Sequence, residues 1–373
     1  MKRVVVTGAK GLIGWHAHAR LHAANCAASF NGTPQPYDIV SLDHAQFDSD
    51  AELIAAVDGA EAVLHFAGIN RAPDDVVENG NPEIARRLLE CCNKANSEPH
   101  IVYANSTHSL NDTPYGRGKR NAGEIFGASG LRFTNLILPH IFGEGARPDY
   151  NNVTATLIKS ILSGETPKVN PEGRVALLHA GAAAQITIDS VSKERTGDIE
   201  PVARPISVPD LLEKLQNFHA LYTSNIYPDL SDSFDLELFN SYRAATYPNE
   251  WPRALKLNVD VRGTLFEAVK GGGGGQTFLS FTEPGVTRGD HFHLNKVERF
   301  LVLQGDAIIR VRKILTDEVW DYRVSGETPA PVDMPTLHTH SIENIGTGPL
   351  LTLFWTHEIF DPEYPDTYAD KVQ

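Results

Sequence analysis

The chain is poor in cysteine, has no long apolar run and carries no excess of positive charge. Three cysteines among 373 residues (Cys26, Cys91 and Cys92) are too few for a disulfide framework, and the adjacent pair is typical of packed helix residues. No apolar stretch approaches the roughly 18 residues of a membrane span. No signal-peptide core follows Met1, so we expect a cytoplasmic protein with no membrane partner.

The charge balance bears on the class of partner. A formal net charge of −14 argues against nucleic acid and anionic membranes, because both require a basic surface. A phosphorylated small substrate stays compatible with this charge, since it needs only a local basic cluster. The length of 373 residues favours two domains, at roughly 100–200 residues per domain.

The amino-terminal half begins with a strand, a glycine-rich loop and a helix. The β-branched run Lys2–Thr7 is typical of a buried parallel strand, and an alanine- and leucine-bearing helix is expected over Trp15–Ala24. Between them, glycines would let the backbone approach a pyrophosphate, which the positive helix terminus would bind. The alternative is that the glycines serve only helix–strand packing. The predicted cofactor-binding residues of this loop are Gly8, Lys10, Gly11, Leu12, Ile13 and Gly14.

Two residues bear on which dinucleotide this loop would bind, and they point to different answers. Asp43 ends the candidate strand Ile39–Leu42, where an acid usually holds a free ribose 2′-hydroxyl and favours NAD(H). Lys10 lies in the glycine loop, where a cation would meet a 2′-phosphate and favour NADP(H). His44 follows Asp43 and suits either cofactor. Both NADP(H) and NAD(H) stay open at this point.

A tyrosine and a lysine form the predicted reductase centre. Tyr115 and Lys119 are four residues apart and therefore share one helix face, while the strand His100–Ala104 delivers Ser106. A cationic lysine would lower the tyrosine pKa, and the hydroxyl would then exchange a proton with a carbonyl or alcohol oxygen held by the serine. The alternative is a solvated pair on a helix surface.

The spacing TGxxGxxG, together with this tyrosine–lysine pair, resembles the extended short-chain dehydrogenase/reductase family. The resemblance implies an α/β Rossmann-type doubly wound parallel sheet. It also implies that Ala67 and Gly68 cover the cofactor, with Asn70 and Arg71 toward the substrate. Further on, Asn151 and Asn152 precede an expected helix over Val153–Leu162 and would either bind a nucleotide diphosphate or simply cap that helix.

The pattern changes near residue 250, where prolines and aromatic residues replace helical periodicity. We expect a reductase domain over residues 1–250, with a small substrate lobe opened by a helix over Leu211–Phe218. Short alternating strands follow from Ala254 onward and predict a second domain over residues 251–373. A run of five glycines, Gly271–Gly275, is expected to form a loop between two of these strands.

The second domain contains a pattern typical of a metal site. His291 and His293 alternate on one strand face, and Glu298 would arrive from the next strand. His340 offers a fourth ligand. Imidazole nitrogens with a carboxylate oxygen suit zinc, iron or manganese, and we predict zinc. The alternative is a set of surface histidines on a hairpin.

These stretches resemble the paired motifs of the cupin family, an all-β barrel with a metal at its mouth. The motif positions that match are Gly285, His291, His293, Glu298, Gly305, Pro335, His340 and Asn344. Leu337 departs from the pattern, because cupins usually carry glycine there. The resemblance implies a cupin barrel that follows the Rossmann-type domain.

A reductase followed by a cupin resembles the CapF-type capsular polysaccharide enzymes over nearly the whole chain. The matching stretches include TGAKG, AGINR, RPDYNNVTAT, EPGVTRGDHFH and FDPEYPDTY. The resemblance implies a bifunctional enzyme that acts on a UDP-sugar in the UDP-N-acetyl-L-fucosamine precursor pathway. Because cupins often self-associate through edge strands, we also expect a homodimer. The cupin would epimerise C3 of UDP-2-acetamido-2,6-dideoxy-4-keto-hexose. The reductase would then reduce the C4 ketone with NADPH to UDP-2-acetamido-2,6-dideoxy-L-talose.

Epimerisation at C3 needs a base, because the C3 proton is acidic only while the C4 carbonyl can accept the charge. Lys296 and His338 are the candidates. The chain departs from the family at Ile137–Leu138, where Arg-Trp is usual, and at Ala180–Gln185. Two alternatives stay open: a sugar reductase whose cupin only dimerises or senses metal, and a cupin dioxygenase or isomerase fused to an inert nucleotide-binding fold.

Overall fold

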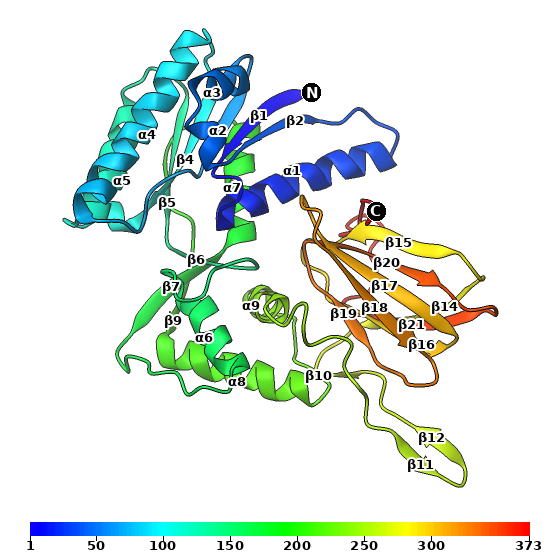
Figure 1. Ribbon diagram of the computed structural model, residues 1–373. Helices are drawn as coiled ribbons and strands as arrows, with labels where there is room; N and C mark the ends of the chain where they lie inside the picture. Colours follow the sequence, from blue (N-terminus) through cyan, green and yellow to red (C-terminus); the bar gives the residue numbers. More distant parts are fainter. The chain divides into compact units, whose positions relative to one another are not determined.

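The computed structural model describes residues Met1–Gln373, and their contacts divide into two compact units (Figure 1). The first unit comprises Met1–Phe142 and Arg174–Ile206, and the second comprises Gly143–Gly173 and Ser207–Gln373. The predicted division at residue 250 therefore lies inside the second unit. No helix of the chain is both long and apolar enough to cross a membrane.

The first unit contains a six-stranded parallel sheet with the strand order β2-β1-β3-β4-β5-β8, which confirms the predicted Rossmann-type sheet. Its central strands are buried on both faces, as continuous apolar runs such as that of β1 predict. The strands are β1 (Lys2–Thr7), β2 (Tyr37–Leu42), β3 (Ala62–His65), β4 (His100–Ser106), β5 (Phe133–Leu138) and β8 (Gly197–Ile199).

Helices cover both faces of this sheet (Figure 1). Helices α1 and α7 pack on one face, and α3, α4 and α5 pack on the other. The helices are α1 (Leu12–Phe30), α2 (His44–Phe47), α3 (Asp50–Val57), α4 (Asp74–Lys94), the 3₁₀ turn η1 (Thr107–Leu110), α5 (Pro114–Gly127) and α7 (Ala180–Ser192). A second sheet has the order β6-β7-β9, formed by β6 (His140–Phe142), β7 (Arg174–His179) and β9 (Arg204–Ser207). Pro139, which has no N–H for a ladder, separates β5 from β6.

Helix α5, which carries Tyr115 and Lys119, is held in position by close packing against α4. A Cβ on Gly118 would lie 2.7 Å from the Val77 carbonyl oxygen, so only glycine allows the two backbones to approach this closely. Arg117 reinforces the contact with two hydrogen bonds to the Glu78 carboxylate, each 2.8 Å long. Thr113 caps α5 by accepting a hydrogen bond from the Gly116 N–H. Tyr115 and Lys119 are therefore carried by a fixed helix.

The second unit combines three helices with a region that is mostly β strand, as the sequence predicts for the carboxyl-terminal part. The helices are α6 (Val153–Leu162), α8 (Val208–Thr223) and α9 (Ser233–Ala244). One antiparallel sheet has the order β14-β21-β16-β19 and the other β18-β17-β20-β15-β22. Their strands are β14 (Gln276–Thr282), β15 (Thr287–Phe292), β16 (Glu298–Gln304), β17 (Asp306–Lys313), β18 (Val319–Ser325), β19 (Val332–Met334), β20 (His338–Asn344), β21 (Leu350–Thr356) and β22 (Tyr368–Ala369).

Two shorter strand pairs complete the second unit. One is the parallel pair β10 (Ile226–Tyr227) and β13 (Lys270–Gly271), which joins the end of α8 to the start of the five-glycine run. The other is the antiparallel hairpin β11 (Asn258–Asp260) and β12 (Gly263–Leu265), which extends away from the two larger sheets of this unit (Figure 1).

A buried carboxylate on β19 attaches the helices of the second unit to its strands. Asp333 is fully buried and accepts two hydrogen bonds from the Arg299 guanidinium, at 2.6 and 3.1 Å. The hydroxyls of Tyr222 on α8 and Tyr227 on β10 also donate to this carboxylate. The helical lobe is therefore built onto the β strands, which is why a boundary at residue 250 does not separate the compact units.

We expect Asp333→Ala to destabilise the second unit by about 3–5 kcal/mol, because Arg299 would be left as a buried charge without its partner. Three tryptophans (Trp251, Trp320 and Trp355) lie in this unit, so urea unfolding followed by tryptophan fluorescence reports its stability. The control Asp321→Ala removes an exposed carboxylate 3.9 Å from Arg310 and should change the free energy of unfolding by less than about 0.5 kcal/mol. Equal effects of the two substitutions would contradict this assignment.

Candidate functional site

The glycine loop between β1 and α1, here called the glycine cradle, packs so closely against neighbouring backbone that side chains would not fit. Gly8 has a φ of +65°, and a Cβ on it would lie 2.8 Å from the Ala67 nitrogen. A Cβ on Gly14 would lie 2.2 Å from the Gly8 carbonyl oxygen. Helix α1 begins at Leu12 with no side-chain cap and no acid in its first turn, so its N–H groups and dipole face the loop. The residues present fit a dinucleotide pyrophosphate.

The loop after β3 is held beside the glycine cradle by side chains. The Ala67 N–H donates to the Thr7 hydroxyl over 3.2 Å. Asn81 on α4 binds both the N–H and the carbonyl of Ile69, at 3.1 and 2.9 Å. Gly68 approaches the Asn81 side chain so closely that a Cβ would lie 2.8 Å from its oxygen. This part of the loop is fixed, while the predicted substrate residues Asn70 and Arg71 that follow are exposed.

Lys10 and Asp43, which favour different cofactors, form an ion pair with each other. The Lys10 ammonium lies 2.8 Å from the Asp43 carboxylate, and this hydrogen bond lowers the pKa of Asp43. Asp43 also caps α2 by accepting from the Gln46 N–H. The Lys10 side chain is 81% exposed, so it is free to reorient toward an incoming phosphate. His44 pairs with Asp48.

Ser106, Tyr115 and Lys119 come together at the carboxyl end of β4. The Lys119 ammonium donates to the Ala104 carbonyl over 2.6 Å and lies 4.1 Å from the Tyr103 ring centroid. Burial lowers the pKa of Lys119 to about 7. The lysine therefore changes its charge near neutral pH, which suits a group that must hold and exchange protons.

Burial raises the pKa of Tyr115, and a hydrogen bond with Ser106 offsets this only in part. The structure thus corrects the expectation that Lys119 would lower the tyrosine pKa, because desolvation outweighs any charge effect of a lysine that is itself desolvated. The Tyr115 hydroxyl is protonated at neutral pH. This is the form that can donate a proton to a ketone oxygen during reduction.

Two histidines, His108 beside Tyr115 and His140 near His108, were not singled out from the sequence. The His108 ring lies 6.1 Å from the Tyr115 ring, centroid to centroid. His140, at the start of β6, has a pKa lowered by burial and by His108, and its buried Nε2 has no hydrogen-bond partner. Isolated histidines give no motif, and only the strand break at Pro139 marks this position. Ile137 and Leu138 are buried in the sheet.

The two asparagines before α6 have different environments. Asn152 is buried and caps the helix, because its side-chain oxygen accepts the Ala155 N–H over 3.0 Å. Asn151 is exposed and has a φ of +52°. The capping alternative therefore accounts for the position of Asn152.

His291, His293, Glu298 and His340 converge in the second unit. Each offers one ligand atom, and these atoms all lie within 4.8 Å of one another. The Glu298 Oε2 lies 3.1 Å from the His293 Nε2 and 3.2 Å from the His340 Nε2. His291 and His293 lie at and just beyond the end of β15, Glu298 opens β16 and His340 lies within β20, so three strands supply the cluster.

The pKa values of these four side chains bear on whether the cluster can bind a metal ion. Burial, His340 and His293 lower the pKa of His291 to about 3, so its imidazole is neutral at physiological pH. Burial alone would raise the pKa of Glu298, but hydrogen bonds with His293 and His340 hold it well below the usual range. Burial acts to lower the pKa of His293, but the hydrogen bond and the charge of Glu298 raise it overall. Three imidazoles and a carboxylate whose ligand atoms lie within 4.8 Å of one another form the donor set of zinc and other first-row divalent ions. The residues present fit such an ion.

Leu337 keeps the turn that glycine usually makes in the second motif. It adopts a φ of +60°, and its side chain is buried. Its N–H donates to the His293 carbonyl over 2.8 Å, and its own carbonyl accepts from the Ile314 N–H over 3.1 Å. Burial of the leucine side chain and these two bonds offset the roughly 1–2 kcal/mol cost of the left-handed backbone.

The two candidate bases have different surroundings. Lys296 is buried, and its ammonium donates to the Pro365 carbonyl over 2.5 Å. His338 donates from Nδ1 to the Thr336 carbonyl over 2.8 Å and stacks on the Trp320 ring. Burial lowers the pKa of His338 to about 4, so its Nε2 has a free lone pair at neutral pH. His338 therefore keeps an unprotonated ring nitrogen, whereas the Lys296 side chain is held by a backbone carbonyl.

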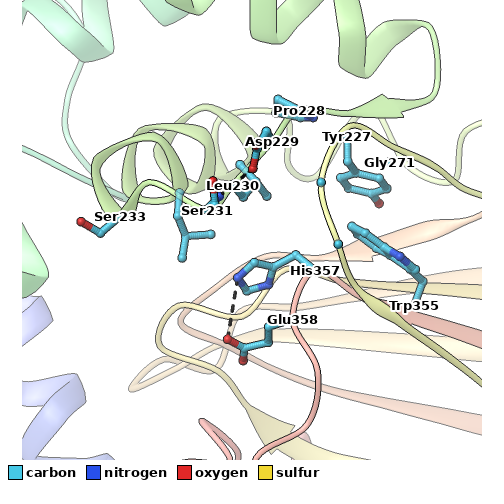
Figure 2. Close-up of a pocket in the computed structure, with 13 residues that line it drawn as sticks. Tyr227, Pro228, Asp229, Leu230, Ser231, Ser233, Gly271, Trp355, His357 and Glu358 are labelled. Carbon is cyan, nitrogen blue, oxygen red and sulfur yellow. Dashed lines mark hydrogen bonds and ion pairs between the residues drawn. The ribbon is translucent and has the colours of Figure 1, made fainter.

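A cavity of about 340 Å³ lies beside Trp355, near the end of β21 (Figure 2). Tyr227, Trp355, His357 and Glu358 line it together with the start of the five-glycine run. The His357 Nδ1 accepts the Val297 N–H over 3.2 Å, and its Nε2 lies 3.8 Å from the Glu358 carboxylate. No sequence motif predicts this cavity, because its lining comes from segments far apart in the chain.

Comparisons with known proteins match both halves of the chain. A model of the NAD dependent epimerase/dehydratase family matches residues 4–197, and a model of the polysaccharide biosynthesis C-terminal domain matches residues 258–368. The UDP-2-acetamido-2,6-beta-L-arabino-hexul-4-ose reductase of Pseudomonas aeruginosa is 29% identical, over 99% of both chains.

Among solved structures, the capsular polysaccharide assembling protein CapF from Staphylococcus aureus is similar at 27% identity, with a TM-score of 0.60 over 99% of this chain and all of that one. The resemblance to CapF-type enzymes is thereby confirmed over the whole chain. A UDP-N-acetylglucosamine 4-epimerase from Methanobrevibacter ruminantium shares the fold at 19% identity, with a TM-score of 0.52 over 65% of this chain and 98% of that one.

The first family model covers more than half of the chain and includes the glycine cradle, the loop after β3 and the Ser106–Tyr115–Lys119 group. The chain belongs to the NAD dependent epimerase/dehydratase family.

Proposed function

We propose that the chain is a bifunctional UDP-sugar enzyme with a C4-ketone reductase site in its first unit and a C3 epimerase site in its second. The observation that carries this proposal is the presence of two complete constellations in one chain. One is the Ser106–Tyr115–Lys119 group beside the glycine cradle, and the other is the buried cluster of three histidines and Glu298. The names of the Pseudomonas reductase and of CapF supply the substrate class and the pathway.

In the reductase site the chain positions and protonates the ketone oxygen. Ser106 and Tyr115 would both bind the C4 oxygen, and the protonated Tyr115 hydroxyl would transfer its proton there. Lys119 lies one helical turn after Tyr115, and burial lowers its pKa to about 7. Its side chain would orient the cofactor ribose. A bound nicotinamide supplies the hydride. The product on this proposal is UDP-2-acetamido-2,6-dideoxy-L-talose.

In the epimerase site we propose His338 as the base that removes the C3 proton. Its Nε2 is unprotonated at neutral pH, and His338 lies two residues before the ligand His340 on β20. Lys296 is the less favoured candidate for this role, because its ammonium donates a hydrogen bond to the Pro365 carbonyl. His291, His293, Glu298 and His340 would hold zinc, which supplies Lewis-acid polarisation of the C4 carbonyl when bound.

We further propose that the β region of the second unit is a cupin barrel. Support comes from its two antiparallel sheets and from the convergence of motif residues that are distant in sequence. Asn344, the last motif position, serves the fold: its side-chain amide donates to the Thr282 and Gly348 carbonyls, at 2.8 and 2.9 Å.

Two variants should separate the two sites. The overall reaction converts the UDP-4-keto-6-deoxy-N-acetylhexosamine with NADPH to the L-talose sugar. We expect Tyr115→Phe and His291→Ala each to slow this reaction by roughly 10²–10⁴-fold. A mixture of the two purified variants should restore product, because the epimerised ketone can pass from one protein to the other.

Product is followed by NMR or mass spectrometry after NADPH oxidation. Tyr364→Phe, which alters an exposed tyrosine, serves as the matched control and should behave as the wild type. A mixture that stays inactive while each variant remains folded would contradict two independent sites.

For the cofactor we propose a preference for NADP(H), with Lys10 turning from Asp43 to the 2′-phosphate. Lys10→Ala should weaken NADPH binding by roughly tenfold, the value of one charge-assisted contact, and leave NADH binding almost unchanged. Asp43→Ala should weaken NADH binding instead. Dissociation constants come from the fluorescence of the reduced nicotinamide.

Lys2→Ala provides a control, because Lys2 forms a similar exposed ion pair with Glu61 in the same unit. If Lys10→Ala affected NADPH and NADH equally, or affected neither, the assignment of Lys10 to the 2′-phosphate would be wrong.

We propose that the protein is a homodimer. The hairpin β11–β12 exposes Val259, Val261 and Leu265, and the edge strand β14 exposes Leu279 and Phe281, so one chain offers two apolar surfaces that a second copy could cover.

Light scattering should give twice the 40.9 kDa chain mass for the wild type. The pair of substitutions Val261→Asp and Leu265→Asp should lower the mass to that of one chain, because two charges would be buried without partners. Val202→Asp, at an equally exposed valine of the first unit, should have no effect. A wild-type mass of one chain would refute the dimer.

A further inference from the structure

The turn that links two of the proposed metal ligands is bound by a carboxylate from the far end of the chain. Leu294, Asn295 and Lys296 follow His293 and lead toward Glu298. Their three N–H groups donate to the Asp366 carboxylate, at 3.0, 2.8 and 2.8 Å. Three backbone donors on one carboxylate form a charge-assisted set that fixes the turn.

The same residue fixes the His293 imidazole. The His293 Nδ1 lies 2.5 Å from the Asp366 carbonyl oxygen, so Nδ1 carries the hydrogen and donates it. The Nε2 faces Glu298, 3.1 Å from its Oε2, and is the ring nitrogen that would bind the proposed ion. A hydrogen bond from the second ring nitrogen to a carbonyl is the usual device that sets the tautomer and the ring orientation of a metal-binding histidine.

The neighbours of Asp366 extend this contact. The Lys296 ammonium donates to the Pro365 carbonyl and lies 3.4 Å from the Thr367 hydroxyl. It also lies 3.9 Å from Glu358, the acid at the edge of the cavity in Figure 2. A buried lysine is thereby held as a structural cation between the turn and the carboxyl-terminal segment.

Beyond Thr367 the chain pairs with the ligand strand itself. In β22, Ala369 pairs with His291 and Tyr368 with Phe292. The Asp370 carboxylate accepts hydrogen bonds from the Thr339 hydroxyl over 2.6 Å and from Arg312 over 2.7 Å. Thr339 lies between His338 and His340, so the segment also reaches the strand that carries the fourth ligand.

We propose that residues Pro365–Val372, here called the carboxyl-terminal strap, complete the metal centre, and that Asp366 is a positioning residue for His293. The proposal rests on the function proposed for the four-residue cluster. The strap contacts the turn, β15 and β20, and so constrains all four ligands before an ion binds. A preorganised site of this kind binds more tightly because less freedom is lost on binding.

The test is a zinc titration of the metal-free full-length protein against a competing chelator. We expect Asp366→Ala to weaken zinc binding by roughly 10–100-fold, the usual effect of losing a group that orients a ligand. Asp366→Asn should fall between Asp366→Ala and the wild type, because asparagine keeps one acceptor oxygen and tolerates the φ of +40° at this position. Glu363→Ala, an exposed acid of the same tail, should bind zinc as the wild type does.

Two further measurements separate positioning from general loss of structure. Hydrogen exchange of the Leu294, Asn295 and Lys296 amides should accelerate in Asp366→Ala without zinc present. The visible absorption of the cobalt-substituted protein should change in Asp366→Ala and not in Glu363→Ala, because the orientation of His293 changes the coordination geometry.

The outcomes distinguish this proposal from the one on which it rests. If the wild type fails to bind zinc or cobalt, the metal centre itself is wrong and the strap proposal falls with it. If the wild type binds zinc and Asp366→Ala binds it equally well with an unchanged cobalt spectrum, the metal centre stands and the strap proposal is overturned.

Discussion

The buried ion pair between Asp333 and Arg299 is the constraint on which the second unit depends. Arg299 follows Glu298 on β16, and neighbouring residues of a strand face opposite sides of the sheet. Arg299 therefore reaches the tyrosines of α8 and β10 through Asp333, while Glu298 reaches the histidine cluster. A shift of β16 by one residue would exchange the two side chains and leave two charges buried without partners. The same strand thus contributes to the attachment of the helical lobe and to the geometry of the proposed metal ligands.

Desolvation sets the chemistry of both proposed sites. In the first unit, burial lowers the pKa of Lys119 to about 7 and raises that of Tyr115, so the tyrosine keeps the proton that a ketone reduction requires. In the second unit, burial keeps His291 and His338 neutral, one as a ligand and the other as the proposed base. Each unit therefore has its own acid–base group, which is what two successive steps on one sugar need.

Local sequence patterns predicted the features that depend on neighbouring residues. The bounds of β1 and α6 agree with the expected Lys2–Thr7 and Val153–Leu162, because a β-branched run and an asparagine cap are local signals. Strand alternation likewise predicted that His291 and His293 converge, and the structure places His293 one residue beyond the end of β15. Contacts between distant residues gave no such signal: Asp366 meets His293 across 73 positions, and Asp333 meets Tyr222 across 111. The raised pKa of Tyr115 could not be predicted from the sequence either, because the burial that causes it depends on the fold.

The central claim is that the second unit inverts C3 independently of the reductase. Proton NMR of the UDP-4-keto-6-deoxy-N-acetylhexosamine in D₂O, with enzyme and without nicotinamide, tests it most directly. The account predicts loss of the C3 proton signal with the wild type and with Tyr115→Phe, and its retention with His291→Ala. A C3 signal that persists with zinc-loaded wild type, while NADPH still drives ketone reduction, would contradict the account and leave a sugar reductase with a structural β region.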